Sequence, residues 1–337
     1  MIFKEEKSYK WLVTGVAGFI GSHLLEELLK KGQSVIGIDN FETGKEANLN
    51  DVYRNVGDES WKNFEFFKKD ITNFDEILGV FKNIDIVCHQ AALGSVPRSF
   101  KHPLRTNEVN ISGFLNILEC CRQNNIKNFV YASSSSTYGD SAILPKKENL
   151  IGRPLSPYAI TKYVNELYAS IYSKHHGVSA TGLRYFNVFG PRQNANGSYA
   201  AVIPKWMHAI IDNTEIIING DGSTSRDFCY IKNVVQANFL SVDRNFSTSE
   251  AEIYNIAYGE SNNLTTLYEL LVNEFKNNKH YYNANLKYQD FREGDIHHSL
   301  ADIDNAKKLL NYSPEYDLRK GIKEFVPWFI NNSSTYA

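Results

Sequence analysis

The segment WLVTGVAGFIG, at residues 11–21, joins a short apolar strand to a helix through a turn that contains three glycines. Apolar side chains then recur over residues 19–31 with the three- and four-residue spacing of one helix face. Glycines permit a tight turn and a close approach of a ligand to the backbone, while a helix N-terminus offers N–H groups and a positive dipole end to a pyrophosphate. The segment therefore predicts the first βα unit of a sheet that binds a dinucleotide.

An acidic residue at the end of the second predicted strand supports this interpretation. That strand reads SVIGID at residues 34–39, and Asp39 follows Gly21 by 18 residues. A carboxylate at this spacing accepts hydrogen bonds from ribose hydroxyls and would repel a 2′-phosphate, which favours NAD over NADP. Asp70, after a third strand at residues 64–67, could contact the adenine edge, although an isolated Asp there could equally cap a helix.

The first half of the chain continues to alternate strands and helices. We expect further strands at residues 84–89, 128–132 and 178–183, with helices at 74–81, 105–123 and 158–175. This order requires a mainly parallel sheet covered on both faces. The second half loses the regularity, so we predict an α/β protein: a Rossmann-type doubly wound parallel sheet over residues 1–186, and a smaller C-terminal α/β substrate-binding lobe over residues 187–337 that is fused to it, with some of the chain crossing back.

Composition excludes several classes of function. The 337 residues carry 36 basic and 38 acidic side chains, so no basic surface for nucleic acid is expected. No run reaches the roughly 18 apolar residues of a membrane helix, and the N-terminus lacks the apolar core of a secretory signal. Four cysteines without CxxC spacing predict reduced thiols and no structural metal. We therefore expect a cytoplasmic protein that acts on small molecules.

A phenol and an ammonium form the candidate catalytic pair. Tyr158 and Lys162 are four residues apart, which places both on one face of the predicted helix. A lysine beside a phenol favours phenolate, so we expect a lowered pKa for Tyr158. Such a phenolate next to a nicotinamide can take a hydroxyl proton while hydride leaves the same carbon. Serines 133–136 end a strand at the edge where ligands bind such sheets, and one of their hydroxyls could share that proton.

These segments belong to a series of motifs that resembles the extended short-chain dehydrogenase/reductases, and among them the nucleotide-sugar 4-epimerases. The resemblance runs from Trp11 to about Trp328. The motifs are GVAGFIGSHL (15–24), DNFETG (39–44), HQAA (89–92), SSSSTYG (133–139), SPYAITK (156–162), LRYFNVFGPRQ (183–193), SRDFCYI (225–231) and REGDI (292–296).

The resemblance implies a mechanism. Tyr158 would be the catalytic base, Lys162 would bind the nicotinamide ribose and tune Tyr158, and Ser134 would match the catalytic Ser/Thr, with Ser135 a second candidate. Tightly held NAD+ would take hydride from sugar C4, and the 4-keto sugar would turn over and take the hydride back on its other face. Further cofactor contacts are implied for Gly15, Gly18, Phe19, Ile20, Gly21, Asp39, Asn40, Asp70, Ile71, Gln90, Ala91, Ala92, Asn110 and Tyr185. Substrate contacts are implied for Asn187 and Arg226 at the diphosphate, Arg292 and Asp295 at the uridine and its ribose, and Gly94, Gln193, Ala201, Val202 and Ser299.

Two departures from related enzymes indicate the substrate. Dehydratases and uronate decarboxylases carry acids where this chain has Ser135 and Ser136, so elimination and decarboxylation are disfavoured. Gly94 and Ser299 replace a Lys and a bulky Tyr of epimerases restricted to non-acetylated sugars, which enlarges the sugar pocket. The resemblance thus implies a UDP-N-acetylglucosamine/UDP-N-acetylgalactosamine 4-epimerase of a surface polysaccharide pathway. Open alternatives are a preference for UDP-N-acetylhexosaminuronic acid or UDP-glucose/UDP-galactose, and a non-catalytic NAD-binding module.

The resemblance also implies a homodimer built on a four-helix bundle. Its helices would be those at 105–123 and 158–175, whose apolar residues could equally be core against the sheet. The residues in question are Ile111, Leu115, Ile117, Leu118, Tyr168, Ile171 and Tyr172.

Overall fold

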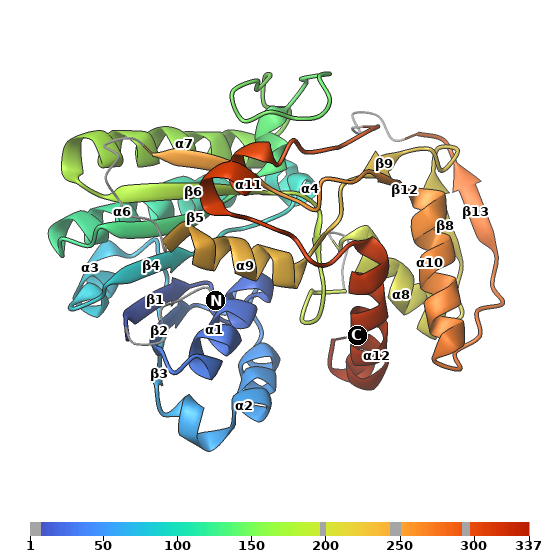
Figure 1. Ribbon diagram of the computed structural model, residues 1–337, viewed down its shortest axis with the longest axis horizontal. Coiled ribbons are helices and arrows are strands. Elements are labelled where there is room, and N and C mark those ends of the chain that lie inside the picture. The colour runs from blue at the N-terminus through green and yellow to red at the C-terminus, as the bar shows by residue number, and fades with distance from the viewer. Residues whose placement is uncertain (1–7, 196–199, 243–250, 292–296, 337) are drawn as a thin grey trace.

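A seven-stranded parallel sheet forms the larger part of the computed structural model, which describes residues 8–195, 200–242, 251–291 and 297–336 (Figure 1). The strand order is β11-β6-β5-β4-β1-β2-β3. The strands are β1 (Lys10–Thr14), β2 (Ser34–Asp39), β3 (Phe64–Lys68), β4 (Ile86–His89), β5 (Asn128–Ser134), β6 (Ser179–Tyr185) and β11 (Glu252–Ile256). The order reverses next to β1, so the predicted Rossmann-type doubly wound sheet is confirmed.

Helices cover both faces of this sheet because each presents one apolar side to it. One face carries α1 (Phe19–Lys30), α2 (Glu46–Trp61) and α9 (Ile231–Val242), and the other carries α3 (Phe74–Leu78), α6 (Phe114–Gln123) and α7 (Pro157–His176) (Figure 1). Leu24, Leu25, Leu28 and Leu29 of α1 are fully buried, as the helical spacing predicted.

The sheet has one strand more than the sequence predicted. β11 lies beyond residue 186 and pairs in parallel with β6, from Glu252↔Thr181 to Ile256↔Tyr185. α9, also beyond residue 186, packs on α1, β5 and β6. Five residues, EIYNI, were too short a signal to be recognised as a strand.

The helix predicted at 105–123 is interrupted. It consists of α5 (Pro103–Asn107), a π-helical turn at Glu108–Gly113, and α6. α4 (Val96–Lys101) precedes them, and a 3₁₀ turn at Ser135–Tyr138 follows β5. π-helical turns often occur at functional sites. Here the turn carries Asn110, one of the expected cofactor residues.

The smaller lobe is built from short strand pairs and three larger helices, and lies to the right in Figure 1. The helices are α8 (Val202–Ile211), α10 (Leu264–Asn277) and α12 (Leu318–Tyr336), with the short α11 (Asp304–Leu310) beside β11. The pairs are β7 (Val188–Phe189) with β10 (Cys229–Tyr230), β8 (Ile216–Asn219) with β13 (Leu286–Gln289), and β9 (Ser225–Arg226) with β12 (Asn262–Asn263). One continuous cluster of buried apolar side chains extends from Leu24 to Phe325, so the two lobes share a core.

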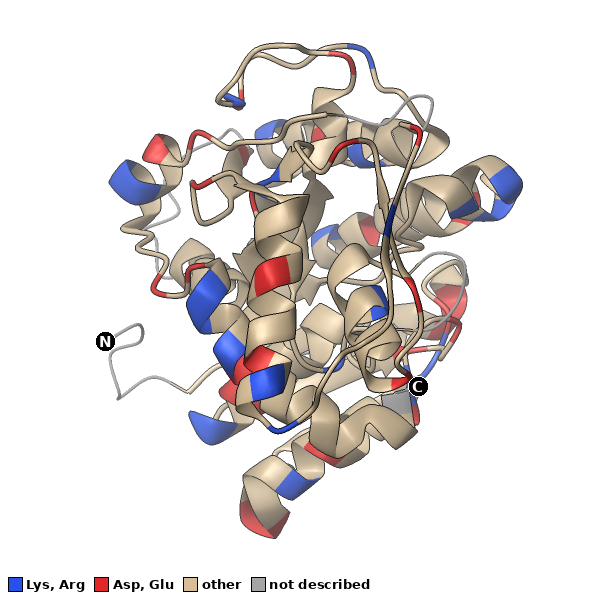
Figure 2. Ribbon diagram, turned by 90° about the vertical axis from the view of Figure 1, so that its right-hand side faces the viewer, with Lys and Arg blue, Asp and Glu red and all other residues tan. Residues whose placement is uncertain are grey.

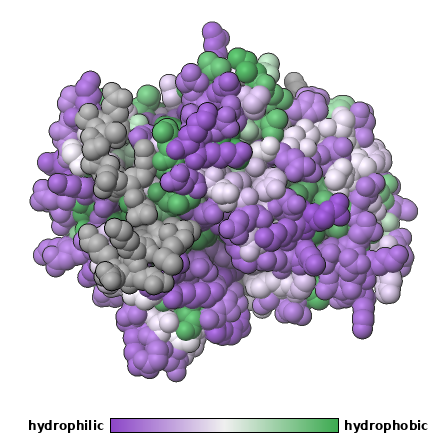
Figure 3. Space-filling view, in the orientation of Figure 1, coloured by the Kyte–Doolittle hydropathy of each residue, from purple (hydrophilic) through white to green (hydrophobic). Residues whose placement is uncertain are grey.

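Charges of both signs are interspersed over the face shown in Figure 2. The face shown in Figure 3 is largely hydrophilic, with scattered apolar patches. Within the described ranges, none of the helices has the length and apolar character needed to span a bilayer.

The expected dimer residues divide into two groups. Ile117 and Leu118 are fully buried, so of the two alternatives open for them the core position beside the sheet holds, and they supply no dimer surface. Ile111, Leu115, Tyr168 and Tyr172 are half-buried, and Ile171 is 51% exposed. Dimerisation itself stays a prediction.

Candidate active site

The glycine turn is shaped to receive a ligand close to the backbone. Gly15 has φ 67°, and a Cβ there would lie 2.7 Å from the Ala91 nitrogen. A Cβ on Gly21 would lie 2.1 Å from the Gly15 oxygen. Gly18 is the N-cap of α1 and has no side chain to accept from the N–H groups of the first turn, which include those of Phe19 and Ile20. The turn thus offers donors to a pyrophosphate, as the NAD site requires.

Asp39 is held at the carboxyl end of β2, directly beside this turn. Its carboxylate accepts hydrogen bonds from the backbone N–H groups of Ala17, at 3.0 Å, and Phe41, at 2.8 Å. Burial raises the pKa of Asp39. A narrow hollow beside it brings together seven of the residues expected to contact the cofactor: Gly15, Asp39, Asn40, Asp70, Ile71, Ala91 and Ala92.

Asp70 is part of this wall and does not cap a helix, because Asn73 is the N-cap of α3. Its carboxylate accepts from Asn40 Nδ2 at 2.9 Å and from Arg105 Nη2 at 3.0 Å. Burial alone would raise the pKa of Asp70, but hydrogen bonds from Thr72, Arg105 and Asn40 lower it to about 2.

α7 places the catalytic candidates. Ser156 begins it as N-cap and accepts from Ala159 N–H at 3.1 Å, which directs Tyr158 and Lys162 toward the end of β5. Lys162 is buried, and its Nζ donates to the Ala132 carbonyl at 2.8 Å. Ser134 ends β5 beside the Tyr158 side chain, and its Oγ accepts from Ser136 Oγ at 3.0 Å, whereas Ser135 begins the 3₁₀ turn.

The expected lowering of the Tyr158 pKa is not what the protein alone produces. Burial raises the pKa of Tyr158, and the Ser134 hydrogen bond opposes this only in part. Burial also lowers the pKa of Lys162 to about 8, while the negative charge of Glu166 opposes that shift. The expectation was wrong because it counted the charge of Lys162 but left out the desolvation of both groups.

Two further polar networks contain residues that are expected to contact the cofactor. Asn110 accepts from Leu93 N–H at 2.8 Å and donates to Thr161 Oγ1 at 3.1 Å, which ties the Ala91–Leu93 segment to the catalytic helix. Asn238 of α9 donates to the Tyr185 hydroxyl at 2.9 Å and accepts from Gln90 at 3.1 Å. The sequence analysis missed Asn238, because no motif marks it.

A second hollow, of about 310 Å³, lies in the smaller lobe. It brings together Asn187, Val202 and Arg226 with the rings of Trp206, Phe228, Phe291 and His297. Asn187 donates to the Asp227 carbonyl at 3.1 Å, and Arg226 Nη1 donates to the carbonyls of Ser225 and His297 at 2.9 and 3.2 Å. A cation, an amide and apolar rings in one hollow suit an anionic group attached to a flat heterocycle.

The remaining substrate candidates are placed separately. Ala201 is exposed next to Val202, whereas Gln193 donates to the Val188 carbonyl at 3.0 Å. Ser299 is only 9% exposed, so it is not a surface serine. Its N–H donates to the carbonyl of Ser225 at 3.0 Å, which places Ser299 next to the residue that precedes Arg226. A Cβ added to Gly94 would meet nothing within 4 Å. Arg292 and Asp295 lie outside the described residues.

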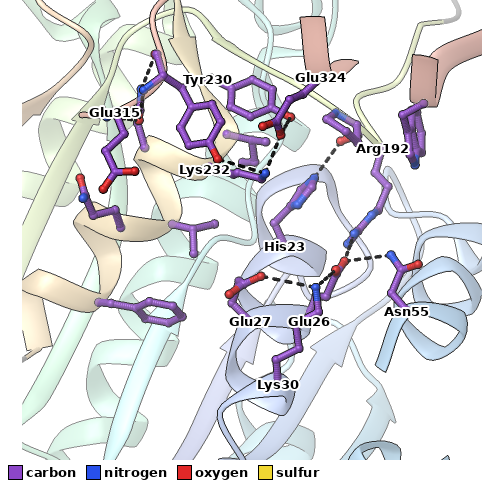
Figure 4. A pocket seen from close by; sticks show the side chains of 18 of the residues that line it. His23, Glu26, Glu27, Lys30, Asn55, Arg192, Tyr230, Lys232, Glu315 and Glu324 are labelled. Atoms are coloured by element: carbon purple, nitrogen blue, oxygen red, sulfur yellow. Dashed lines mark hydrogen bonds and ion pairs between the residues drawn. The ribbon is translucent and has the colours of Figure 1, made fainter. Parts of the chain in front are cut away.

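A separate cavity of about 620 Å³ lies between α1, α9, α12 and the turn at Pro191 and Arg192 (Figure 4). Its charged side chains mostly pair with one another. Arg192 pairs with Glu26 of α1 and with Asp51 of α2, the latter at 3.0 Å, and Lys232 pairs with Glu324 at 2.5 Å. The contacts of Arg192 fasten the turn that follows β7 to α1 and α2, and the Lys232–Glu324 pair joins α9 to α12.

Comparison with known proteins assigns the fold to a family. Residues 11–257 match the family described as "NAD dependent epimerase/dehydratase family". A putative UDP-glucose 4-epimerase of Methanocaldococcus jannaschii is 36% identical over 96% of this chain and 99% of its own length.

Two solved structures extend the comparison. The UDP-N-acetylglucosamine 4-epimerase from Methanobrevibacter ruminantium, in complex with UDP-N-acetylmuramic acid, is 38% identical with a TM-score of 0.87, over 97% of this chain and 99% of that one. The UDP-glucuronic acid 4-epimerase from Bacillus cereus, in complex with UDP-glucuronic acid and NAD, is 30% identical with a TM-score of 0.83, over 96% of this chain and 99% of that one.

Proposed function

Since this chain belongs to the NAD dependent epimerase/dehydratase family, we propose that it interconverts UDP-N-acetylglucosamine and UDP-N-acetylgalactosamine at sugar C4. The reaction type, which is 4-epimerisation of a UDP-sugar with NAD as cofactor, follows from the family and the relatives without any assumption about the sugar. The observation that carries the reaction type is the placement of Tyr158 beside Ser134 and one helical turn from the buried Lys162, at the edge of a nucleotide-binding sheet.

The described residues fit NAD. Gly15, Gly18 and Gly21 let the turn pack tightly on its own backbone, so that the N–H groups at the start of α1 would face the pyrophosphate, and Asp39, held by Ala17 and Phe41, would accept from the adenosine ribose. The wall of Asn40, Asp70, Ile71, Ala91 and Ala92 would enclose the adenosine half, and Gln90, Asn110 and Tyr185 would contact the nicotinamide half. NAD+ bound there supplies the acceptor for the C4 hydride.

The side chains of this protein would then manage the proton and the orientation of the sugar. Tyr158 Oη takes the proton of the C4 hydroxyl, Ser134 Oγ shares a hydrogen bond with the same oxygen, and the Lys162 ammonium stabilises the phenolate. A positive nicotinamide close to the phenol would further favour its ionised form.

The nucleotide end of the substrate would be held away from the reacting carbon. Asn187 and Arg226 would bind the diphosphate, with Arg292 and Asp295 at the uridine, while Val202, Ala201 and Gln193 line or flank that region. Because the holding contacts are made to the nucleotide, the 4-keto sugar remains free to turn and present its other face.

The N-acetyl preference is supported by small side chains. Gly94 has open space around its Cβ position, and Ser299 stands where a bulky ring would narrow the sugar site. Ser135 and Ser136 supply no acid for elimination or decarboxylation. The relatives include enzymes that act on glucose, N-acetylglucosamine and glucuronate forms, so uronate and non-acetylated sugars are the competing substrates.

A substrate panel tests this proposal. Purified protein with NAD would be incubated with UDP-N-acetylglucosamine, UDP-glucose, UDP-glucuronate and UDP-N-acetylglucosaminuronate, and the configuration at C4 followed by NMR. We expect the highest kcat/KM for UDP-N-acetylglucosamine. A higher kcat/KM for either uronate would contradict the proposed substrate and identify that acid in its place. If none of the four UDP-sugars is epimerised, epimerase function is contradicted.

A further inference from the structure

A buried ion pair lies one helical turn beyond Lys162 and joins three elements of the catalytic region. Glu166 of α7 is bound in a two-point contact by Arg184 of β6, with Nε to Oε1 at 2.8 Å and Nη2 to Oε2 at 2.7 Å. Ser133 of β5 donates its hydroxyl to Glu166 Oε1 at 2.5 Å. The side chains of Glu166 and Arg184 are only 6% and 3% exposed.

We propose that Glu166 is a positioning residue for the reaction: its negative charge keeps the Lys162 ammonium protonated, and its carboxylate fixes the end of β5, which carries Ser134, against α7. This inference rests on the proposed roles of Tyr158, Lys162 and Ser134. It assigns to Glu166 a role that its ion pair with Arg184 alone would not require.

The geometric part follows from two neighbouring contacts. Lys162 Nζ donates to the carbonyl of Ala132, and Glu166 accepts from the side chain of Ser133. Residues 162 and 166 are one turn apart, so the same helix face holds two successive residues of β5. Ser134 is the next residue along the strand, and its distance from Tyr158 depends on how these two contacts align β5 with α7.

The electrostatic part follows from the charges around Lys162. Burial disfavours the ammonium, and Glu166 is the charge that opposes this effect. His89 of β4 also faces Lys162, but burial lowers its pKa to about 3 and it remains neutral. Tyr131 of β5 faces Glu166, and burial raises its pKa, so it is neutral too.

The contacts of Arg184 explain why the pair is firmly held. Its Nη1 donates to the carbonyl of Glu148 at 2.9 Å, and its guanidinium lies 4.8 Å from the ring centroid of Tyr138. Tyr138 in turn donates to Asn255 Oδ1 of β11 at 2.6 Å. Glu166 is therefore anchored to a framework that does not depend on any ligand.

Replacing Glu166 by Gln tests the charge while keeping the size of the side chain. In E166Q we expect the pKa of Lys162 to fall below its wild-type value of about 8, as measured by NMR of protein labelled with [13Cε]lysine and stripped of cofactor. The alkaline fall of kcat should move to lower pH by the same amount, with activity lost about tenfold per pH unit beyond it.

Two further variants separate the charge from a structural role. E166Q leaves Arg184 buried without its partner and could fail to fold, so the double variant E166Q/R184Q, which removes both charges, is measured beside it. We expect the double variant to regain thermal stability but to keep a lowered Lys162 pKa. S133A keeps every charge, and it should lower kcat equally at all pH values while the Lys162 titration stays that of the wild type.

The outcomes are distinct. An unchanged Lys162 pKa in the folded double variant would overturn the electrostatic role, and an unchanged kcat in S133A would overturn the positional one. Absence of epimerase activity from the wild-type protein would contradict the proposed function, while the Lys162 titration would still decide the effect of Glu166.

Discussion

Tyr158 carries the proton transfer in the proposed reaction, and its hydroxyl can be removed with little change in shape. We expect Tyr158→Phe to lower kcat by about 10²–10⁴-fold, because general base catalysis by a positioned side chain contributes that much. Steady-state kinetics with the preferred UDP-sugar would measure the loss, and absorbance of released nicotinamide cofactor would show that NAD is still bound.

Tyr163 provides the matched control for this prediction, since it is half-buried on the same helix. Tyr163→Phe should leave kcat within a few-fold of wild type. Full activity of Tyr158→Phe would mean that another group takes the proton, or that the chain serves only as a NAD-binding module.

Glu26 makes stability depend on acid pH. Burial alone would raise its pKa, but Arg192 and Lys30 lower it from 4.5 to about 2. A carboxyl with a lowered folded pKa contributes its stability above the unfolded value, and loses it as pH falls from about 4.5 to about 2. The contribution is about 3 kcal/mol at most.

Urea unfolding at several pH values checks this prediction. Glu26→Gln should be less stable than wild type at pH 7, and the difference should vanish toward pH 2. Glu27→Gln, at a more exposed neighbour, should follow the wild-type curve. A difference between wild type and Glu26→Gln that is the same at all pH values would show that the charge of Glu26 has no part in it.

The site candidates that the sequence could indicate are those that lie at a fixed number of residues from a motif. Asp39 follows the glycine turn, and Tyr158 and Lys162 share a helix face, so local pattern was enough. Asn238 could not be predicted, because its partner Tyr185 is 53 residues away and only the fold brings them together. The direction of the Tyr158 pKa was missed for a related reason: burial depends on tertiary packing.

Among the elements, the junction of β1 and α1 tolerates the least change. A Cβ on Gly21 would press on the backbone oxygen of Gly15, which cannot yield as a flexible side chain could. We expect Gly21→Ala to weaken NAD binding by more than about tenfold and to destabilise the fold by about 1–3 kcal/mol. Equilibrium dialysis of NAD and thermal unfolding would measure the two effects.

Gly79 offers a control, because a Cβ there would meet nothing within 4 Å and its φ is ordinary. Gly79→Ala should bind NAD as the wild type does. Equal NAD binding by Gly21→Ala and Gly79→Ala would show that the close packing at this turn is not needed for the cofactor.

The order of the strands could be predicted for the first lobe because their apolar runs alternate with helical periods. The 16-residue helix α2 was missed, since Leu49 and Val52 are its only buried apolar residues and leave a weak helical pattern. The π-helical turn at Glu108–Gly113 could not be predicted, since no residue type marks the i→i+5 backbone hydrogen bonds that define it. β11 was missed because a five-residue segment with a Glu and an Asn among its apolar residues becomes a strand only where a sheet edge is available to pair with it.

For the whole molecule, we expect self-association through the face formed by α4, α5 and α7. Phe100, Leu104, Leu167 and Ile171 are 50–86% exposed there, which is unusual for large apolar side chains. Light scattering at working concentration should give the mass of a dimer. The double variant Leu167→Glu/Ile171→Glu should reduce the mass to that of one chain, while Ile217→Glu, on the smaller lobe, should not. A monomeric wild type would contradict the prediction.

The return of α9 and β11 to the sheet has a consequence for anyone who recombines such enzymes. A chimera that joins one relative's first 186 residues to another's remainder would carry a foreign edge strand and a foreign covering helix in its nucleotide-binding sheet. The β6 edge would then depend on contacts that were never selected together, and an unsatisfied edge invites aggregation. An exchange of substrate preference is therefore better made by transplanting surface segments of the smaller lobe between fixed strands than by a single crossover.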